Sequence, residues 1–468
     1  MELRFTPHLV KPRSSPAFLR LPRFAAQGRG ETGRAEKRDK GASEYLPRTF
    51  DKVRGSTFPS SPLLYLLKMA LTIHFFYLIF FNTTENIFKK MKVPFFDLKP
   101  QFTSIEEEIK TALDEVFKTQ QFILGPKVEG LEQAIAHYCQ TPYAIGVASG
   151  SDALLLSLMV LGIGKGDEVI LPSFTFFSTA GVVSRLSATP VFVDIDPDTY
   201  NIDPSKIEEK ITSRTKAIIP VHLFGQCADM DPLLELARSK NLFVIEDAAQ
   251  ALGAEYRPHP NSIGRRAGQI GDLGCFSFYP TKNLGAFGDA GMVVTHNAHW
   301  AEKIRFLRVH GSQPKYFHKW IGINSRLDAI QAAILLVKFR HLEKWTEERQ
   351  RKAKRYGELF QDLVSSVDGL RPPTIQYENR HIFHQYVIRL QERDRLRQFL
   401  MENGIGTDIY YPLPLHLQEC YSFLKYRRGD LPVSEKASEE VLALPIYPEL
   451  TEDQQMMVVD RIKAFYNR

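Results

Sequence analysis

Seven short apolar runs dominate the middle of the chain. They lie at 143–149, 167–173, 189–195, 215–225, 241–249, 275–280 and 291–296, and the stretches 151–163 and 231–241 between them have helical patterns. Inside the runs, apolar residues follow one another instead of alternating with polar ones, as in strands that are buried on both faces. Buried strands separated by helices predict an α/β fold in which a mostly parallel, seven-stranded sheet spans about residues 140–295.

The pattern changes after Ser325. Long helical stretches follow, and then come a short strand candidate at 384–390 and a helix that Gly404 would end. At 468 residues the chain is also longer than one domain usually is. We therefore expect a large domain at residues 91–325 and a smaller C-terminal α+β domain at residues 326–468.

Residues 1–90 differ in composition from the rest of the chain. They hold 16 Lys and Arg against 7 Asp and Glu, a net charge of +9, so the total of +6 leaves −3 for the remainder. The basic balance therefore belongs to this extension and gives no reason to expect nucleic-acid binding by the rest. Residues 1–60 are rich in Arg, Pro, Ser and Gly without sustained periodicity, which is typical of disorder.

The stretch 62–81, PLLYLLKMALTIHFFYLIFF, is about as long as a membrane-spanning helix needs to be. Lys68 and His74 interrupt it, and the Pro-rich lead before it is too long for a simple secretory signal. It is a membrane anchor, a targeting signal, or non-native sequence upstream of the natural start codon. We favour the third interpretation, and with it no membrane association, because Met91 opens the strongly patterned sequence.

The four cysteines, Cys139, Cys227, Cys275 and Cys420, lie far apart and form no CxxC pair or Cys/His cluster. This spacing disfavours disulfides and a zinc site. We therefore expect no bound metal and a cytoplasmic location.

In open α/β sheets, ligands collect outside the carboxyl ends of the strands. A first motif in this position is VASGSDALLL, where Gly150 and Ser151 lie between a strand and a helix. Backbone N–H groups, small hydroxyls and the helix dipole make such a turn a phosphate site, although an ordinary Ser N-cap is an alternative. The Gly-rich loops of nucleotide hydrolases and dinucleotide binders are missing, so a smaller phosphate ligand is indicated.

Two further motifs follow other runs. In PSFTFFSTA, Phe174, Phe176 and Phe177 are either core residues or a platform for a flat ring. In LFVIEDAAQALGA, the carboxylate of Asp247 sits at a predicted strand end, where burial would call for a cationic partner. The alternative is an N-cap aspartate on a helix that begins at Ala248.

The fourth motif, CFSFYPTKNLGAFGDAGMVV at 275–294, holds one lysine, Lys282, among aromatic, Gly and small residues. A solvated surface lysine is the default interpretation. If Lys282 is buried instead, its pKa falls and its neutral amine becomes a nucleophile toward carbonyls. The glycines of this stretch would let the backbone pass close to another group; they are Gly285, Gly288 and Gly291.

One ligand needs all four motifs, namely pyridoxal 5′-phosphate. Its phosphate fits the helix turn, its ring an aromatic side chain, its pyridine nitrogen a carboxylate, and its aldehyde a lysine. Because all four motifs occur together at predicted strand ends, this cofactor is a better explanation than the separate structural alternatives given for each motif.

With these motifs the chain resembles the nucleotide-sugar aminotransferases of the DegT and StrS type, which have the aspartate aminotransferase fold (fold type I). The resemblance runs from VPFFDLKPQF at 93–102 to the C-terminus and does not cover residues 1–90. It implies that Lys282 is the catalytic lysine that bonds the cofactor's aldehyde. Ser277 would bind the phosphate, and Asp247 would pair with the pyridine nitrogen.

The resemblance implies further cofactor contacts. Gln250 would lie near the 3-hydroxyl and Phe176 would stack on the ring. Gly150 and Ser151 would form the phosphate turn, with Ser where many members have Thr. Asn324 in GINSRLDAIQAA matches an asparagine that reaches the phosphate in the neighbouring subunit's site. An obligate homodimer with shared active sites is therefore expected.

The resemblance also implies the substrates, with glutamate as amino donor and a nucleotide-linked keto-sugar as acceptor. Tyr410 stands where many relatives have His before YP. With the stretch 313–326, it makes the chain look more like enzymes that aminate dTDP-3-keto-6-deoxyhexoses at C3 than those that act at C4. The candidate substrate contacts are Tyr316, His318, Tyr410, Tyr411 and His416. Aromatic packing at a dimer interface is the alternative for each of them.

The expected activity is thus a transamination that makes an amino-deoxy sugar nucleotide for amino-sugar and polysaccharide biosynthesis. Some family members carry His in place of the lysine and catalyse dehydration, so the presence of Lys282 favours transamination. A PLP-dependent sugar dehydratase and a non-catalytic sensor or regulator with the same fold remain the alternatives.

Overall fold

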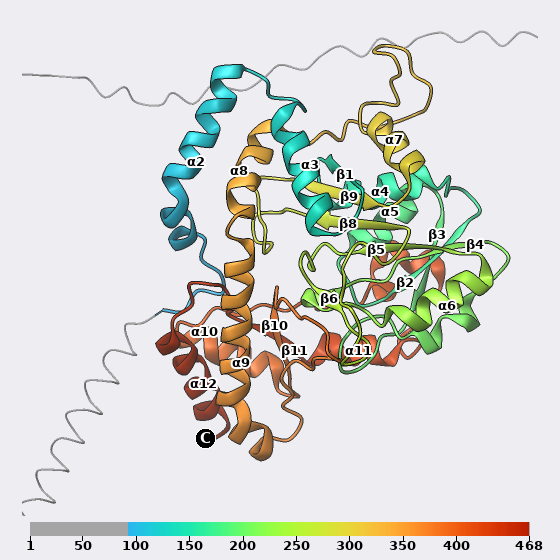
Figure 1. The fold of residues 1–468 in the computed structure, drawn as a ribbon. Helices are drawn as coiled ribbons and strands as arrows, with labels where there is room; N and C mark the ends of the chain where they lie inside the picture. The colour runs from blue at the N-terminus through green and yellow to red at the C-terminus, as the bar shows by residue number, and fades with distance from the viewer. Residues whose placement is uncertain (1–91, 468) are drawn as a thin grey trace, which may run out of the picture. The chain divides into compact units, whose positions relative to one another are not determined.

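The computed structural model describes residues 92–467. The predictions made for residues 1–90, including the apolar stretch 62–81, lie outside this part of the chain. Figure 1 shows its helices and strands.

A seven-stranded sheet forms the centre of the fold, in the order β1-β9-β8-β5-β4-β2-β3. Its strands are β1 Tyr143–Val147, β2 Glu168–Pro172, β3 Thr189–Val193, β4 Thr215–Ile218, β5 Phe243–Asp247, β8 Leu273–Ser277 and β9 Gly291–Thr295. Neighbouring strands run parallel from β3 to β8, whereas β9 is antiparallel to both β8 and β1. Six of the strands lie within the apolar runs and β8 overlaps the run at 275–280, so the predicted mostly parallel sheet is confirmed.

Helices cover both faces of the sheet (Figure 1). One face packs against α4 Gly150–Val160, α5 Ser178–Arg185 and α7 Ala298–Leu307, and the other against α3 Pro126–Tyr138, α6 Met230–Lys240 and α8 Ala329–Phe339. Successive residues of β2 explain the continuous apolar runs, because Val169 and Leu171 enter one core and Ile170 the other. Side chains of a strand alternate between faces, so a strand buried on both faces needs apolar residues throughout.

Beyond α8 the chain forms a core of its own around a two-stranded antiparallel sheet. Its elements are α9 Leu342–Ser366, β10 Tyr386–Arg389, α10 Arg393–Glu402, α11 Pro432–Glu440, β11 Val441–Leu444 and α12 Glu452–Tyr466. Near the start of the described part, α2 Lys99–Thr119 packs against α8. The mixture of helices and strands after Ser325 agrees with the predicted α+β character, while the boundary at residue 325 stays a prediction.

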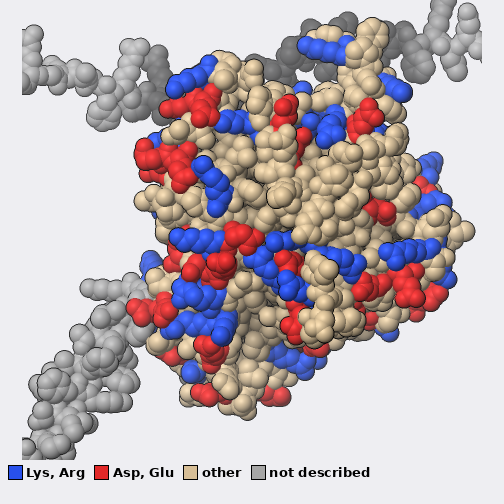
Figure 2. Space-filling model, viewed as in Figure 1, with Lys and Arg blue, Asp and Glu red and all other residues tan. Residues whose placement is uncertain are grey.

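The surface of the described part carries charges of both signs. On the face seen in Figure 2, Lys and Arg side chains lie interspersed with Asp and Glu, which gives no electrostatic reason to expect nucleic acid there. Within residues 92–467, no helix is both long and apolar enough to cross a membrane. In this same part of the chain, no group of His, Cys, Asp and Glu is placed to hold a metal ion, and the four cysteines are unpaired.

Buried Glu246 holds the loop that precedes β8. Its carboxylate accepts hydrogen bonds from the backbone N–H groups of Gly268 at 2.8 Å, and of Ile270 and Gly271 at 2.6 Å each. Nε2 of His222 lies 2.7 Å from the same carboxylate, and Nδ1 of His222 accepts from a backbone N–H. His222 therefore carries its hydrogen on Nε2 and donates it to Glu246. These bonds hold the loop before β8 against β5, so that the two strands end side by side.

Candidate active site

A pocket of about 680 Å³ lies at the carboxyl ends of the parallel strands. It contains nine of the residues predicted from the sequence: Gly150, Ser151, Phe176, Asp247, Gln250, Ser277, Lys282, Tyr410 and Tyr411. Strands β1, β8, β5 and β2 all point toward this edge, since β1 and β8 are both antiparallel to β9. The polar residues that follow these strands therefore lie in one pocket. Two of its residues, Gly150 and Tyr411, are 261 positions apart along the chain.

Lys282 sits in the loop between β8 and β9, with its backbone N–H bonded to the carbonyl of Tyr279 at 2.8 Å. Within the described residues, its Nζ makes no hydrogen bond and no ion pair. Burial lowers its pKa to about 8, although the nearby charge of Asp247 acts in the opposite direction. Lys282 therefore loses its proton at a lower pH than a solvated lysine does and is mostly uncharged only above about pH 8. The interpretation as a solvated surface lysine is wrong, because the residue lines the pocket.

Asp247 is the last residue of β5 and is 5% exposed. Its Oδ2 accepts a hydrogen bond from the Thr179 hydroxyl at 2.8 Å, and its Oδ1 accepts from the Ala249 N–H at 3.2 Å. Burial raises its pKa, and these two bonds oppose the shift. No basic side chain in the described part forms an ion pair with it. Since no helix begins at Ala248, the N-cap alternative is wrong, and the buried carboxylate faces the pocket without a cation.

Gln250 and Tyr411 form one polar wall. Oε1 of Gln250 accepts from the Phe224 N–H at 2.7 Å, which orients the amide so that its Nε2 donates to the Tyr411 hydroxyl at 3.2 Å. The Phe176 ring lies 6.3 Å from that of Tyr411 and is 57% exposed, whereas Phe174 is fully buried. Phe176 is thus available to cover the face of a flat ligand, and Phe174 belongs to the core.

The turn before α4 makes a small, hydroxyl-rich corner. Ser149 caps the helix by accepting from the Asp152 N–H at 3.1 Å, so the N-cap interpretation holds for this residue. Ser151 shares a 2.6 Å hydrogen bond with Ser178, and both line the pocket with Ser277. A Cβ on Gly150 would lie only 2.6 Å from the Cβ of Ser277. Glycine is therefore needed for the turn and β8 to meet, and the corner exposes hydroxyls and helix N–H groups suited to a phosphate.

Two of the glycines after Lys282 let the backbone pass close to another group, as predicted. A Cβ on Gly285 would lie 2.3 Å from the carbonyl oxygen of Pro280, and one on Gly291 would lie 2.4 Å from the backbone of Ser149. The chain itself makes the close approach at both positions, so they allow the lysine loop to fold back and β9 to pass under the serine turn.

Three predicted residues lie on the surface away from this pocket. Tyr316 is 79% exposed, and His318 bonds only to the backbone of its own loop, through the His310 carbonyl at 2.9 Å. Asn324 is exposed and likewise outside the lining of the pocket. None of the three contributes to the pocket of its own chain.

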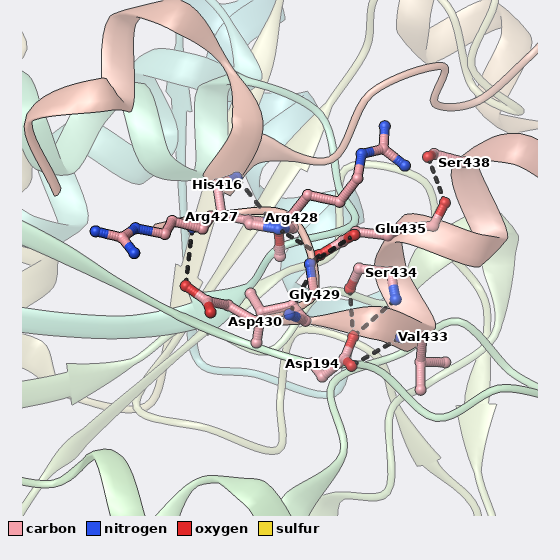
Figure 3. A network of polar contacts seen from close by, with 12 residues as sticks. Asp194, His416, Arg427, Arg428, Gly429, Asp430, Val433, Ser434, Glu435 and Ser438 are labelled. Carbon is pink, nitrogen blue, oxygen red and sulfur yellow. Dashed lines mark hydrogen bonds and ion pairs between the residues drawn. The ribbon is translucent and has the colours of Figure 1, made fainter. Parts of the chain in front are cut away.

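His416 also lies outside the pocket, in the polar network of Figure 3. It is 2% exposed, with Nδ1 2.6 Å from the Ser173 hydroxyl and Nε2 3.2 Å from Glu435. Glu435 also accepts from the Gly429 N–H at 2.8 Å, and Asp194 accepts from the N–H of Ser434 in the first turn of α11. Burial lowers the pKa of His416 against the opposing effect of Glu435. The histidine thus fastens the segment after Tyr411 to the end of β2 instead of lining the pocket.

Sequence reasoning missed three residues of this site. Thr179 and Ser178 stand in the same stretch as Phe176, and their small hydroxyls directly after a strand were a usable signal. His384 lines the pocket from the C-terminal part of the chain. No local pattern around it indicates a site, because its position depends on how the two parts pack.

The pocket fits pyridoxal phosphate on structural grounds. The buried Asp247 lacks a cation that a protonated ring nitrogen would supply, and the uncharged amine of Lys282 suits an aldehyde. Phe176 offers a ring face, and the serine corner offers phosphate donors. Each functional group of the cofactor thus has a chemically matched partner.

Comparison with known proteins agrees with this fit. Residues 103–463 match the DegT/DnrJ/EryC1/StrS aminotransferase family. A "Pleiotropic regulatory protein" of Geobacillus stearothermophilus is 51% identical over 80% of this chain and 99% of its own. The dTDP-3-amino-3,4,6-trideoxy-alpha-D-glucose transaminase of Streptomyces venezuelae is 42% identical over 81% of this chain and 97% of its own. A crystal structure of S. venezuelae DesV has a TM-score of 0.77 at 42% identity, covering 81% of this chain and 99% of that one.

The lowered pKa of Lys282 predicts a pH dependence. An amine attacks an aldehyde only when it is uncharged, and a pKa of about 8 makes the uncharged form predominate above that pH. We expect the rate at which the cofactor-free protein captures pyridoxal phosphate to rise through pH 8 and then level off. Stopped-flow visible absorbance from about pH 6 to about pH 10 measures this rate.

Lys338 provides a matched control. Its pKa is also lowered to about 8, but its Nζ donates to the Gly285 carbonyl at 2.7 Å and does not line the pocket. The Lys338→Met variant should still capture pyridoxal phosphate, and the Lys282→Met variant should not. Capture that is independent of pH around 8, or that survives Lys282→Met, would contradict the assignment.

Proposed function

Because the chain belongs to the DegT/DnrJ/EryC1/StrS aminotransferase family, we propose that its pocket transfers an amino group from glutamate to a nucleotide-linked keto-deoxy sugar. The family depends on pyridoxal phosphate, and the chain is an aminotransferase of this kind. The observation that carries the proposal is the pairing, in one pocket, of a buried unpaired carboxylate with a lysine of lowered pKa. The product would be an amino-deoxy sugar nucleotide.

Asp247 has the role of holding a proton on the ring nitrogen of the cofactor. When bound, pyridoxal phosphate accepts the electron pair that stays on a substrate carbon after its proton has left. A carboxylate that is buried and fixed by Thr179 and Ala249 keeps the nitrogen protonated, because the ion pair replaces the hydration that Asp247 lost.

Lys282 has two roles. Its amine would hold the cofactor through the aldehyde and would be free for a second role when an amino donor is bound in its place. Once free, it removes the proton from the donor's α-carbon, and the same amine delivers a proton when the keto-sugar accepts the amino group. A pKa near 8 suits both directions, since the group changes its charge close to neutral pH. The expected kinetics are ping-pong.

The remaining residues bind and orient. Gly150, Ser151 and Ser277 would hold the phosphate, while Gln250 would lie near the 3-hydroxyl with its amide fixed by Phe224. Phe176 would cover one face of the ring. Tyr410 and Tyr411 line the same pocket and are the proposed sugar contacts.

The proposed acceptor is a dTDP-3-keto-6-deoxyhexose. The name of the S. venezuelae relative, 42% identical over nearly its whole length, supports amination at C3 of a dTDP-linked sugar. Tyr410 before Tyr411 and Pro412 supports the same choice. Glutamate as donor rests on analogy with the family, and a cytoplasmic location rests on the unpaired cysteines.

A homodimer with shared sites is also proposed. Asn324, Tyr316 and His318 lie outside their own chain's pocket, as residues that reach a neighbouring subunit's site would. Tyr316, Phe317 and Ile321 are exposed by 79%, 68% and 93%, and an apolar surface loop of this kind favours a protein partner. The second copy would supply Asn324 to the phosphate corner.

A regulatory role is the second candidate. It is favoured by the name of the G. stearothermophilus relative, which is 51% identical to this chain. A sensor could bind the same cofactor and sugar without turnover, so activity separates the two functions. Dehydration is disfavoured because Lys282 is present.

Product analysis tests the proposed reaction. With glutamate and a panel of dTDP- and UDP-linked 3-keto and 4-keto sugars, we expect amination at C3 of the dTDP-linked 3-keto-6-deoxyhexose. Lys282→Ala should lower kcat by about a thousandfold or more because it removes the proton carrier. Cofactor-loaded wild-type protein that aminates none of the sugars would favour the regulatory role, and a Lys282→Ala variant that keeps the wild-type kcat would contradict the mechanism.

Mixed dimers test the shared site. Asn324→Asp would place a negative charge at the phosphate and inactivate the neighbouring subunit's site, while Lys282→Ala inactivates its own. Mixing the two inactive variants under conditions of subunit exchange should restore about a quarter of wild-type activity, since half of the dimers would then have one intact site. If Asn324 acted within its own chain, the heterodimer would have no intact site and mixing would restore nothing.

A further inference from the structure

His384 lines the active-site pocket but has no part in the mechanism above. It belongs to a short segment before β10, and side chains of α9 form hydrogen bonds to the backbone of this segment. Nη1 of Arg349 donates to the carbonyls of Phe383 at 3.2 Å and His384 at 3.3 Å, and Gln350 donates to the carbonyl of His381 at 2.9 Å. With three backbone carbonyls fixed in this way, His384 has a defined position and is 8% exposed.

A hydrogen bond to Asn283 determines which ring nitrogen of His384 carries the hydrogen. Nδ2 of Asn283 donates to the Ile382 carbonyl at 3.2 Å, so its Oδ1 is the atom that lies 3.1 Å from Nδ1 of His384. A carbonyl oxygen only accepts, and Nδ1 must therefore donate. In a neutral ring Nε2 is then an acceptor, and nothing in residues 92–467 donates to it.

The ring is uncharged. Burial lowers the pKa of His384 well below its usual value, and the charges of Lys282 and Arg349 lower it further. Asn283, which holds the ring, directly follows Lys282 in the chain. Two residues that line the pocket thus each have an unpaired polar atom in the described part of the chain: Nε2 of His384 lacks a donor, and Nζ of Lys282 lacks an acceptor.

We propose that His384 is a positioning residue for Lys282, whose ammonium donates a hydrogen bond to Nε2 of His384 while it carries the substrate proton. This inference rests on the function proposed above for Lys282. The structure records no hydrogen bond between the two groups, so Lys282 makes it by moving its flexible stem whenever its amine is not bonded to the cofactor. The proton is not passed from Nζ of Lys282 to His384. The histidine only orients the ammonium that carries this proton.

An ammonium has three N–H donors and needs acceptors in a pocket with little water. Both oxygens of Asp247 already accept hydrogen bonds from Thr179 and Ala249, and its charge is taken by the ring nitrogen. A fixed neutral acceptor can stabilise the ammonium without trapping it as a permanent ion pair. It also limits the directions in which the proton is delivered.

Two substitutions of His384 distinguish the role of Nδ1 from the role of Nε2. The amide of His384→Asn ends at about the distance of Nδ1, so it can still bond Asn283 but leaves no acceptor at the position of Nε2. The amide of His384→Gln extends to about the distance of Nε2, so it restores the acceptor and loses the bond to Asn283. A purely structural role predicts that Asn is the better replacement, and the proposed role predicts Gln.

The first measurement uses the cofactor-free protein. Loss of the acceptor destabilises the ammonium of Lys282, so in His384→Asn the midpoint of the pH dependence of pyridoxal phosphate capture should fall by about half a unit, as expected for one hydrogen bond. In His384→Gln the midpoint should stay at that of the wild type. A midpoint that does not move in His384→Asn would overturn the proposal.

The second measurement is steady-state turnover with glutamate and the accepted keto-sugar. We expect kcat to fall about tenfold in His384→Asn with KM within about twofold, and to stay within about threefold of wild type in His384→Gln. Equal losses in both variants, or the opposite order, would overturn the positioning role. Wild-type protein that captures no pyridoxal phosphate would instead reject the proposed function, which these variants do not test.

Discussion

The buried carboxylate of Asp247 is the constraint on which the site depends. It ends the central strand β5 and is 5% exposed, with hydrogen bonds from Thr179 and Ala249 but no ion pair within the described part of the chain. A charge in this position is costly unless a ligand completes it. A protonated ring nitrogen would form an ion pair with Asp247 and offset this cost. The buried carboxylate therefore favours the binding of a cationic ring over that of a neutral one.

The neighbouring residues provide the geometry. Glu246 holds the loop before β8 through three backbone N–H groups and His222, so that β5 and β8 end together. Gly150 allows the serine turn to approach Ser277, and Gly285 allows the lysine loop to fold back on itself. Lys282 is thereby brought from a separate strand to the same pocket as Asp247, with its amine desolvated and unpaired. Asp247 and Lys282 form no ion pair with each other, and a ligand bound between them would use both groups.

The strands and the cofactor motifs could be predicted because their signals are local. The run LFVIED indicates a buried strand, and its terminal Asp247 is unusual by its position alone. Residues whose placement depends on distant parts of the chain were less predictable. His416 looked like a pocket residue within its own stretch, yet it bonds Ser173, 243 positions away, and serves the packing of α11. Helices α2 and α12 were not predicted, and His384 reaches the site only because the C-terminal part packs over it.

Borohydride trapping tests most directly whether Lys282 is the residue that binds the cofactor. The protein is loaded with pyridoxal phosphate and reduced, which makes the bond between lysine and cofactor permanent, and the modified peptide is identified by mass spectrometry. The mass of the phosphopyridoxyl group should lie on Lys282 alone, within the peptide that spans β8 and β9. Modification of a different lysine, or no modification of a protein that carries the cofactor, would contradict the site as a whole.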